Sequence, residues 1–354
     1  MKNLNKILIG GLVLIGSFML SGKVEAAEYK YPVYPNSPEW EASTQDRGNL
    51  KAMLQIPENT LKELSTEELV NAVLEYPCFN DMYYYDSKQE GFEAMKSSFN
   101  GINELFQRKD ADRILLEKYE ETQKELKDIS SDTKEFSQEN YELICRKSNI
   151  EVLLAQEEVK ENMTNEERNK LDNLIATYKL TEEKSADQLT YKQNTYFKIT
   201  EEQMTNNIET RASVNTPKGT PVYVFSRGEQ ISSTDKYYMR LEVERDFPGT
   251  IIVGDGTTCY NCHSFAWYWM DVNNKYWMND PSAYMTDGSY KEVSLNGRKI
   301  NDRIWFSKVH SAVETVPGDK NDMVSKWGDY PLVRHSLTNN PYYTAPLTVK
   351  AYRR

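Results

Sequence analysis

The hydrophobic pattern of this chain changes its period once, near Ile208, and that change limits what the chain can fold into. From about Thr60 to Lys198, apolar residues recur at spacings of three and four, as on one face of an α-helix. Residues 212–221 are small, polar and interrupted by Pro and Gly, which is typical of a linker. Short apolar runs separated by turn clusters follow. The pattern predicts a multidomain protein, with an N-terminal all-α helical domain followed by a C-terminal α+β domain.

Two capping boxes mark helix starts inside the first region. Ser65-Thr66-Glu67-Glu68 and Thr164-Asn165-Glu166-Glu167 each pair a hydroxyl with a carboxylate three residues later, and these groups satisfy first-turn backbone amides. The apolar stripes that follow them predict the core of a helix bundle. The sequence of this region has no His, Gly-rich loop or metal-ligand spacing, so the pattern favours packing over ligand binding.

Seven β-leaning runs and one helix are expected in the second region. The helix spans Asn261 to Met270 and ends before the turn at Asn273-Asn274. A helix packed on a largely antiparallel sheet is α+β architecture. The expected strands cover residues 222–225, 237–243, 250–253, 303–306, 312–316, 323–327 and 347–352.

Residues 1–26 are typical of a secretory signal peptide. Lys2 and Lys6 precede an apolar run of 14 residues, Ile7 to Leu20, and Val24-Glu25-Ala26 follows at cleavage spacing. The run is shorter than the roughly 18 apolar residues that cross a bilayer. We therefore expect a secreted protein, extracellular or associated with the cell wall, with no membrane partner after cleavage. The rest divides into an extended N-terminal segment (27–58), an acidic helical domain (59–205), a linker (206–220) and the C-terminal domain (221–354).

Acidic residues are concentrated in the helical region. The chain has a formal net charge of −11; residues 26–213 alone carry −15, whereas residues 214–354 carry +2. Nucleic acids and anionic membranes attract basic surfaces, so neither is expected as a partner. All three His and five of the six Trp lie in the C-terminal region, where we therefore expect any chemistry.

The four cysteines leave several pairings open. Cys78 and Cys145 lie in the helical region and either form a disulfide or remain buried thiols. Cys259-Tyr260-Asn261-Cys262-His263 fits the C-x-x-C-H spacing of haem c attachment, although a haem c module is expected to be helical and these flanks are β-rich. The sequence also leaves open a disulfide between Cys259 and Cys262, which would prevent the Cys262 sulfur from reacting.

Nucleophilic catalysis is the remaining interpretation of Cys262. At a helix N-terminus, backbone amides and the helix dipole stabilise a thiolate, the form of cysteine that attacks a carbonyl. His310 lies 48 residues later, at the start of an apolar run, and is the candidate base. His263 and His335 are expected to be structural or rim residues.

Four stretches resemble secreted Firmicute proteins of the papain-like NlpC and CHAP superfamily. The resemblance covers roughly residues 216–354, and its stretches are 260–267 (YNCHSFAW), 276–282 (YWMNDPS), 308–313 (KVHSAV) and 324–328 (VSKWG). It implies a papain-like α+β domain in which Cys262, on the first helix, is the nucleophile and His310, on the facing strand, is the base. Upstream, residues 65–119 are similar to an accessory domain of the same exported proteins.

The expected orienting residue departs from the family pattern. These enzymes tend to carry an acidic residue or Asn on the strand after the His, and this sequence has Ser325 and Lys326 there. Lys326 offers the imidazole no acceptor, so Ser325 is the expected orienting residue. The backbone N–H of Cys262, with Tyr260 or Asn261, is expected to hold the oxyanion.

The sequence thus predicts a secreted cysteine peptidase or amidase that uses Cys262, His310 and Ser325 and needs no metal or cofactor. Its expected partner is a peptide or peptidoglycan substrate, and the oligomeric state stays open. Two alternatives remain: a catalytically inactive binding or adhesion module on the same fold, and a haem c protein.

Overall fold

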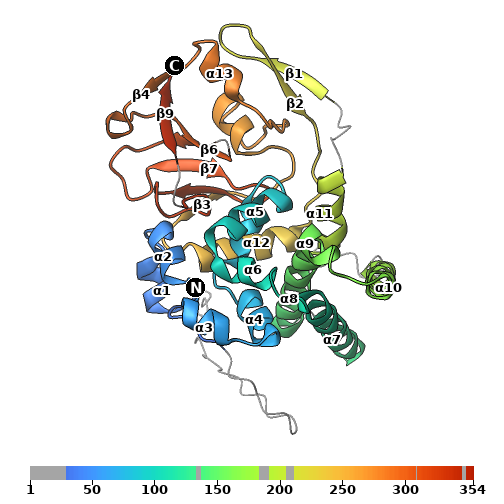
Figure 1. The fold of residues 1–354 in the computed structure, drawn as a ribbon. Coiled ribbons are helices and arrows are strands. Elements are labelled where there is room, and N and C mark those ends of the chain that lie inside the picture. The colour runs from blue at the N-terminus through green and yellow to red at the C-terminus, as the bar shows by residue number, and fades with distance from the viewer. Residues whose placement is uncertain (1–28, 133–136, 183–190, 205–210, 308, 345–347) are drawn as a thin grey trace, which may run out of the picture.

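The computed structural model describes residues 29–132, 137–182, 191–204, 211–307, 309–344 and 348–354. Helices form one half of the molecule, and a large antiparallel sheet lies in the other (Figure 1). The predicted signal peptide lies outside the described residues. Within the described part of the chain, no helix combines the length and the apolar character needed to span a membrane.

The N-terminal half is helical, as the apolar spacing predicts. In the first capping box the Ser65 hydroxyl accepts from the Glu68 N–H, and the Glu68 carboxylate accepts from the Ser65 N–H at 2.7 Å. Thr164 and Glu167 form the second box in the same way. The helices are α1 (Pro38–Ser43), α2 (Arg47–Met53), α3 (Glu58–Glu63), α4 (Thr66–Leu74), η1 (Phe79–Tyr84), α5 (Lys88–Ser98), α6 (Asn100–Leu105), α7 (Ala111–Asp132), α8 (Gln138–Leu154), α9 (Glu157–Lys160), α10 (Asn165–Glu182) and α11 (Thr195–Met204).

The expectation of an extended segment over residues 27–58 is wrong, because α1 and α2 form there. The Ser37 hydroxyl caps α1 by accepting from the Trp40 N–H at 3.1 Å, and Pro38 suits the first turn. Asp46 caps α2 in the same way. Trp40 and the α2 residue Leu50 are buried, so packing on the helical core holds both short helices in place.

The C-terminal half contains a two-stranded ribbon and a seven-stranded antiparallel sheet. The ribbon pairs β1 with β2, and β1 lies inside the predicted linker. The sheet order is β3-β8-β7-β6-β5-β9-β4, and the region is mixed α+β. Strands β4 and β8 are not among the predicted runs. The strands are β1 (Arg211–Asn215), β2 (Pro221–Phe225), β3 (Ile251–Gly254), β4 (Lys291–Val293), β5 (Arg303–Phe306), β6 (His310–Glu314), β7 (Met323–Lys326), β8 (Leu332–His335) and β9 (Val349–Arg353).

The strand predicted over residues 237–243 is wrong, because this stretch is part of helix α12 (Ser233–Asp246). The Ser232 hydroxyl caps the helix by accepting from the Asp235 N–H at 3.0 Å. Met239, Val243 and Asp246 are buried at helical spacing, which the apolar run alone did not reveal.

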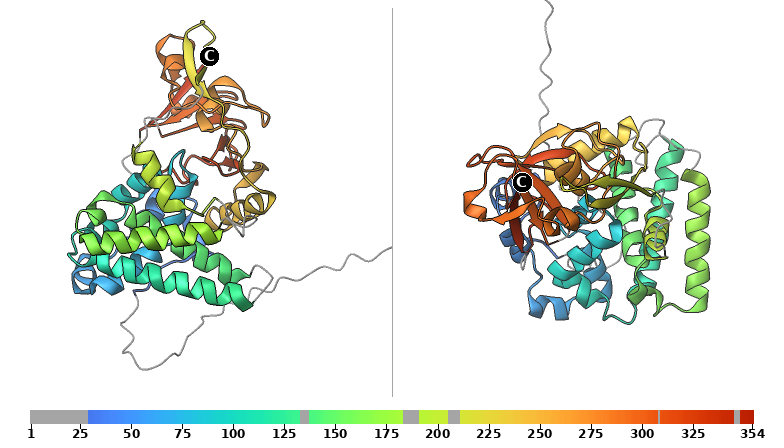
Figure 2. Two further views of the ribbon diagram at one scale, coloured as in Figure 1. Left: turned by 90° about the vertical axis from the view of Figure 1, so that its right-hand side faces the viewer. Right: turned by 90° about the horizontal axis from the view of Figure 1, so that it is seen from above.

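One apolar core joins the helical half to the sheet half. It contains Phe92 and Leu153 from the helices together with Trp327 and Val333 from the sheet region. The Tyr84 ring contacts the Trp327 ring edge-on, with centroids 5.6 Å apart. The left view of Figure 2 shows the sheet region seated on the helical region. The two regions therefore pack as neighbours with a common interior.

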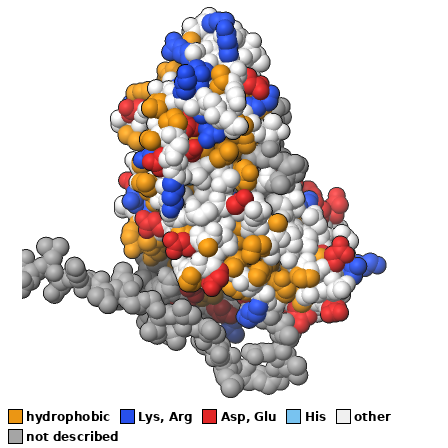
Figure 3. Space-filling view, turned by 90° about the vertical axis from the view of Figure 1, so that its left-hand side faces the viewer, with side chains coloured by type: hydrophobic (Ala, Val, Ile, Leu, Met, Phe, Trp, Pro, Cys, Tyr) orange, Lys and Arg blue, Asp and Glu red, His pale blue; other side chains and the backbone are white. Residues whose placement is uncertain are grey.

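Charge is distributed differently over the two ends of the molecule. On the face drawn in Figure 3, Lys and Arg side chains gather toward the end formed by the sheet region, and Asp and Glu are more frequent toward the helical end. This distribution agrees with the acidic composition of the helical region.

Candidate functional site

Cys262 begins a short helix over residues 262–268, whose last five residues form the π-helical element η2 (Ser264–Tyr268). The Asn261 Oδ1 atom accepts from the Ser264 N–H at 3.1 Å, and the Asn261 carbonyl accepts from the Phe265 N–H at 3.0 Å. Asn261 is therefore the N-cap. Cys262 occupies the first helical position, where the sequence placed it.

The Cys262 sulfur is fully buried against the start of β6. Burial, with Asp86 nearby, raises the pKa of the thiol well above its usual range. The backbone N–H groups of Ser311 and His263 lie near the sulfur and act to lower its pKa. The Ser311 hydroxyl holds the same helix, because it lies 2.8 Å from His263 Nδ1 and accepts from Trp267 Nε1–H at 2.8 Å. In this conformation Cys262 is a protonated thiol.

His310 immediately precedes Ser311 at the start of β6. Its ring stacks on Tyr342 with centroids 3.6 Å apart and an angle of 11°, and it lies on the same sheet face as its cross-strand partner Phe306. Neither ring nitrogen has a hydrogen-bond partner among the described residues, so no hydrogen bond joins it to Cys262. Burial lowers the pKa of His310 well below its usual range, and the imidazole is neutral.

The prediction that Ser325 orients His310 is wrong. The Ser325 hydroxyl lies 2.7 Å from His335 Nε2 and accepts from Trp327 Nε1–H at 3.0 Å. His335 Nδ1 lies 2.8 Å from the Ser336 carbonyl and donates to it, so Nε2 accepts from Ser325. The register of β7 with β8 brings His335 to this position, because Met323 pairs with His335 and Ser325 follows two residues later on the same face. Ser325 therefore fixes His335.

Sequence reasoning missed Asp86, which follows η1 in the helical half. Its Oδ2 atom accepts from Asn261 Nδ2 at 2.6 Å. One ligand atom each from Asp86, Cys262 and His263 lie within 4.8 Å of one another. Burial raises the pKa of Asp86 to about 6. Asp86 is 175 positions from Asn261 in the sequence and lies in no motif, so no sequence signal marked it.

Lys326 is a second buried charge near the cysteine. Its ammonium donates to the Gly328 carbonyl at 2.6 Å. Burial lowers the pKa of Lys326 to about 8, against the opposing effect of nearby acidic groups that include Asp86 and Cys262.

Residues 84–86 form a cover over this site. The Tyr84 carbonyl accepts from the Tyr342 hydroxyl, and the Tyr85 ring contacts the Tyr342 ring with centroids 4.9 Å apart. Gly328 has φ +48°, and a Cβ atom there would lie 2.3 Å from the Tyr85 carbonyl oxygen. The cover therefore packs closely on both Tyr342 and Gly328, and Asp86 at its end meets the Cys262 helix.

A cavity of about 530 Å³ lies beside the Cys262 helix. Cys259 and Tyr260 form one wall, and Gly254 and Val272 belong to the others. Cys262 does not line this cavity. All four cysteines are free thiols, so neither disulfide that the sequence left open is formed.

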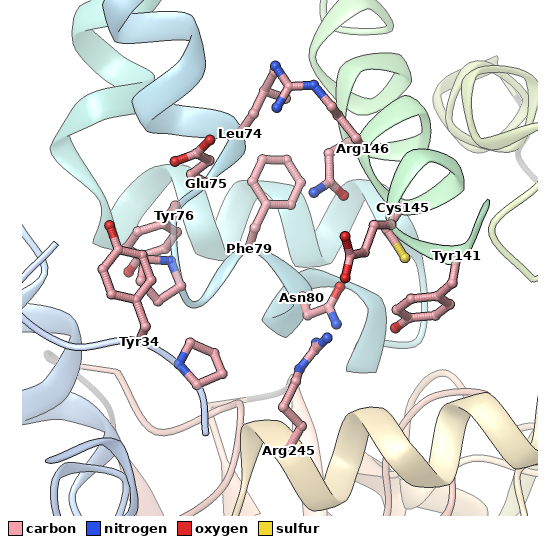
Figure 4. A pocket seen from close by; sticks show the side chains of 14 residues that line it. Tyr34, Leu74, Glu75, Tyr76, Phe79, Asn80, Tyr141, Cys145, Arg146 and Arg245 are labelled. Carbon is pink, nitrogen blue, oxygen red and sulfur yellow. The ribbon is translucent and has the colours of Figure 1, made fainter. Parts of the chain in front are cut away.

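A second cavity of about 260 Å³ lies where the helical half meets α12 (Figure 4). Phe79 points into its middle, and Arg146 and Arg245 approach from opposite sides. Arg245 is paired with Asp246 at 2.7 Å. None of the predicted site residues lines it.

Comparison of the chain with family models, with curated proteins and with solved structures gave no match. The site is therefore interpreted from its own geometry.

Proposed function

We propose that this protein is a secreted, latent cysteine hydrolase of amide bonds with a papain-like arrangement of Cys262 and His310. The observation that carries the proposal is the placement of the buried Cys262 at a helix start, beside the residue that follows His310 in β6. His310 adds a buried imidazole with both nitrogens unpartnered. Leaving such a group unsatisfied costs about 1–3 kcal/mol, and functional sites are where proteins tolerate that cost.

Each group has a defined role in the proposed reaction. The Cys262 thiol transfers its proton to His310, and the sulfur attacks the substrate carbonyl carbon. His310 then protonates the departing amine, and water hydrolyses the thioester to regenerate the thiol. The Cys262 N–H, at the first helical position, is an oxyanion donor. Asn261 is a poor second donor, because both hydrogens of its amide are already used by Asp86 and the Met278 carbonyl.

Latency follows from the resting state of the two groups. The thiol and the imidazole are both neutral and buried. Attack requires the cover of residues 84–86 to withdraw, which hydrates both groups and moves both pKa values toward their usual ranges. The cavity walled by Cys259 and Tyr260 is the adjoining space for a peptide substrate.

The test is hydrolysis by the reduced full-length protein. Amines released from purified cell wall and, separately, from a denatured protein would be measured for the wild type and for Cys262→Ser, His310→Gln and Cys145→Ser. We expect Cys262→Ser and His310→Gln to abolish release. Cys145→Ser, which replaces a free thiol of the helical half outside the substrate cavity, is the matched control and should retain it. Unchanged turnover in Cys262→Ser would refute the assignment of the nucleophile.

A catalytically silent binding module is the second candidate. It is favoured by the engagement of Ser325 with His335, which leaves His310 without an orienting partner among the described residues. In that case cell wall would sediment the wild type and Cys262→Ser equally, and neither would release amines. The haem alternative receives no support, because Cys262 and His263 are both buried among protein atoms and His263 Nδ1 lies 2.8 Å from the Ser311 hydroxyl.

A further inference from the structure

Three buried or half-buried side chains of different chemistry converge at the junction of the helical and sheet regions. Asp86 comes from the connection between η1 and α5, and Cys262 and His263 come from the short helix. Their nearest ligand atoms lie within 4.8 Å of one another. We propose that Asp86, Cys262 and His263 form a binding site for Zn²⁺.

The distances between the three ligand atoms match a zinc site once the side chains move slightly closer together. Bonds of about 2.3 Å to sulfur and about 2.0–2.1 Å to nitrogen and oxygen place tetrahedral ligand atoms roughly 3.3–3.6 Å apart. Side-chain rotation that closes the cluster by about 1 Å reaches this spacing. Three protein ligands leave one position for water, and thiolate with imidazole favours zinc over calcium or magnesium.

Two of the three ligands already have a hydrogen bond that holds them in place. Asn261 Nδ2 donates to the Asp86 carboxylate at 2.6 Å. The Ser311 hydroxyl lies 2.8 Å from His263 Nδ1. Such outer contacts orient ligands in metal sites and change metal affinity when they are removed. The cluster is therefore supported from two directions, by the N-cap residue and by β6.

Charge also favours a cation at this point. Cys262 is fully buried and Asp86 is half-buried, so little water screens a cation that lies between them. Zn²⁺ would replace the thiol proton, which leaves to solvent, and its two charges would balance the thiolate and the carboxylate. Lys326 and Arg227, which also act on Asp86, oppose the metal to a lesser degree because they are single charges outside the cluster.

Bound zinc would have two consequences. It would join the cover of residues 84–86 to the Cys262 helix through metal bonds. It would also occupy the sulfur electron pair that attacks a carbonyl, so zinc would inhibit the hydrolase; this second consequence rests on the proposed function.

Cobalt is the direct probe, because Co²⁺ bound to thiolate in a tetrahedral site gives sulfur-to-metal charge-transfer absorption. Reduced, chelator-treated full-length protein would be titrated with Co²⁺, and the bound Co²⁺ would then be displaced with Zn²⁺. We expect one Co²⁺ per chain with that absorption, and its loss in Cys262→Ser. Asp86→Asn and His263→Gln should each weaken binding at least tenfold. Cys259→Ser, three residues away, should leave binding unchanged.

The proposal is overturned if the wild type shows no thiolate-to-cobalt absorption, or if Cys259→Ser loses it while Cys262→Ser keeps it. Thermal unfolding in chelator shows which variants are folded, and Ser311→Ala adds a variant outside the ligand set that should weaken binding about 10–100-fold. Metal uptake is read without any substrate. Failure of the metal site and failure of the hydrolase are therefore separate results.

Discussion

Asn261 and Asp86 join the two halves of the molecule: Asn261 Nδ2 donates to Asp86 Oδ2 across 2.6 Å, over 175 positions of sequence. The same Asn261 side chain caps the Cys262 helix through the Ser264 N–H. It also donates to the Met278 carbonyl and accepts from the Met278 N–H. One buried amide thus connects the helix start, the chain beyond it and the helical half.

Replacing that amide should be strongly destabilising. Asn261→Ala removes the helix cap and leaves buried polar groups of Met278 and Asp86 without their partner. We expect a loss of about 2–4 kcal/mol in the free energy of unfolding, measured by urea denaturation. Asn273→Ala is the control, since Asn273 is exposed and bonds only locally to Asp271; its loss should stay within about 0.5 kcal/mol.

A buried charge cluster in the helical half should contribute more to the free energy of unfolding than an ion pair on the surface. Asp81 accepts from Arg47 and lies 2.8 Å from the Lys51 ammonium, with all three side chains buried. Asp81→Asn removes the carboxylate that both buried cations contact directly, and we expect a loss of about 3–5 kcal/mol in the free energy of unfolding, measured by urea denaturation. Glu117→Gln breaks a half-exposed pair with Arg113 and should change stability by no more than about 1 kcal/mol. Equal losses of stability in Asp81→Asn and Glu117→Gln would contradict the burial of Asp81.

The stability of a Gly328 variant should show how closely residues 84–86 pack on Gly328. Gly328→Ala adds a methyl group 2.3 Å from the Tyr85 carbonyl oxygen, and it places Ala at φ +48°. Gly318→Ala carries similar backbone strain at φ +84°, with open space around it, and should cost about 1–2 kcal/mol. We expect the Gly328 variant to lose more than this control in thermal unfolding. A smaller loss would mean that residues 84–86 do not press on Gly328.

The two cysteines of the C-x-x-C stretch should differ in reactivity. Cys262 is fully buried and its pKa is raised, whereas Cys259 is partly exposed beside a cavity. Each unit by which the pKa of a thiol is raised lowers its thiolate fraction about tenfold. Iodoacetamide should therefore modify Cys259 of the native reduced protein before Cys262. Peptide mass spectrometry over time would measure both rates. Gly328→Ala should accelerate the modification of Cys262 and leave that of Cys259 unchanged. If Cys262 of the wild type were modified faster than Cys259, the buried resting state would be refuted.

His335 should make stability depend on pH. Burial lowers its pKa to about 4 in the folded protein, from about 6.5 in an unfolded chain. The unfolded state therefore binds the proton between these values, and stability falls as pH drops from about 6.5 to about 4. His310, whose ring centroid is 6.4 Å away, acts in the same direction. His335→Gln should remove up to about 3 kcal/mol of this loss, measured by urea denaturation at pH 7 and pH 4.

Local features of the fold were predictable because they depend on residues close in sequence. The capping box at Ser65 requires only a hydroxyl and a carboxylate three positions apart. The strand over residues 303–306 follows from a short apolar run, and the helix expected from Asn261 onward begins at Cys262. The same local reasoning failed for α12, where helical burial is set by what the helix packs against.

The sequence by itself determined the helical half, most of the strands and the position of Cys262, because hydrogen bonds over three or four residues and side-chain alternation specify them. Only the tertiary structure decided that Asp86 meets Asn261, that Ser325 bonds His335, and that no hydrogen bond joins His310 to the sulfur. Those relations depend on strand order, on register and on which sheet face each residue occupies. They arise when segments far apart in the chain bury their surfaces together, and no local spacing encodes them.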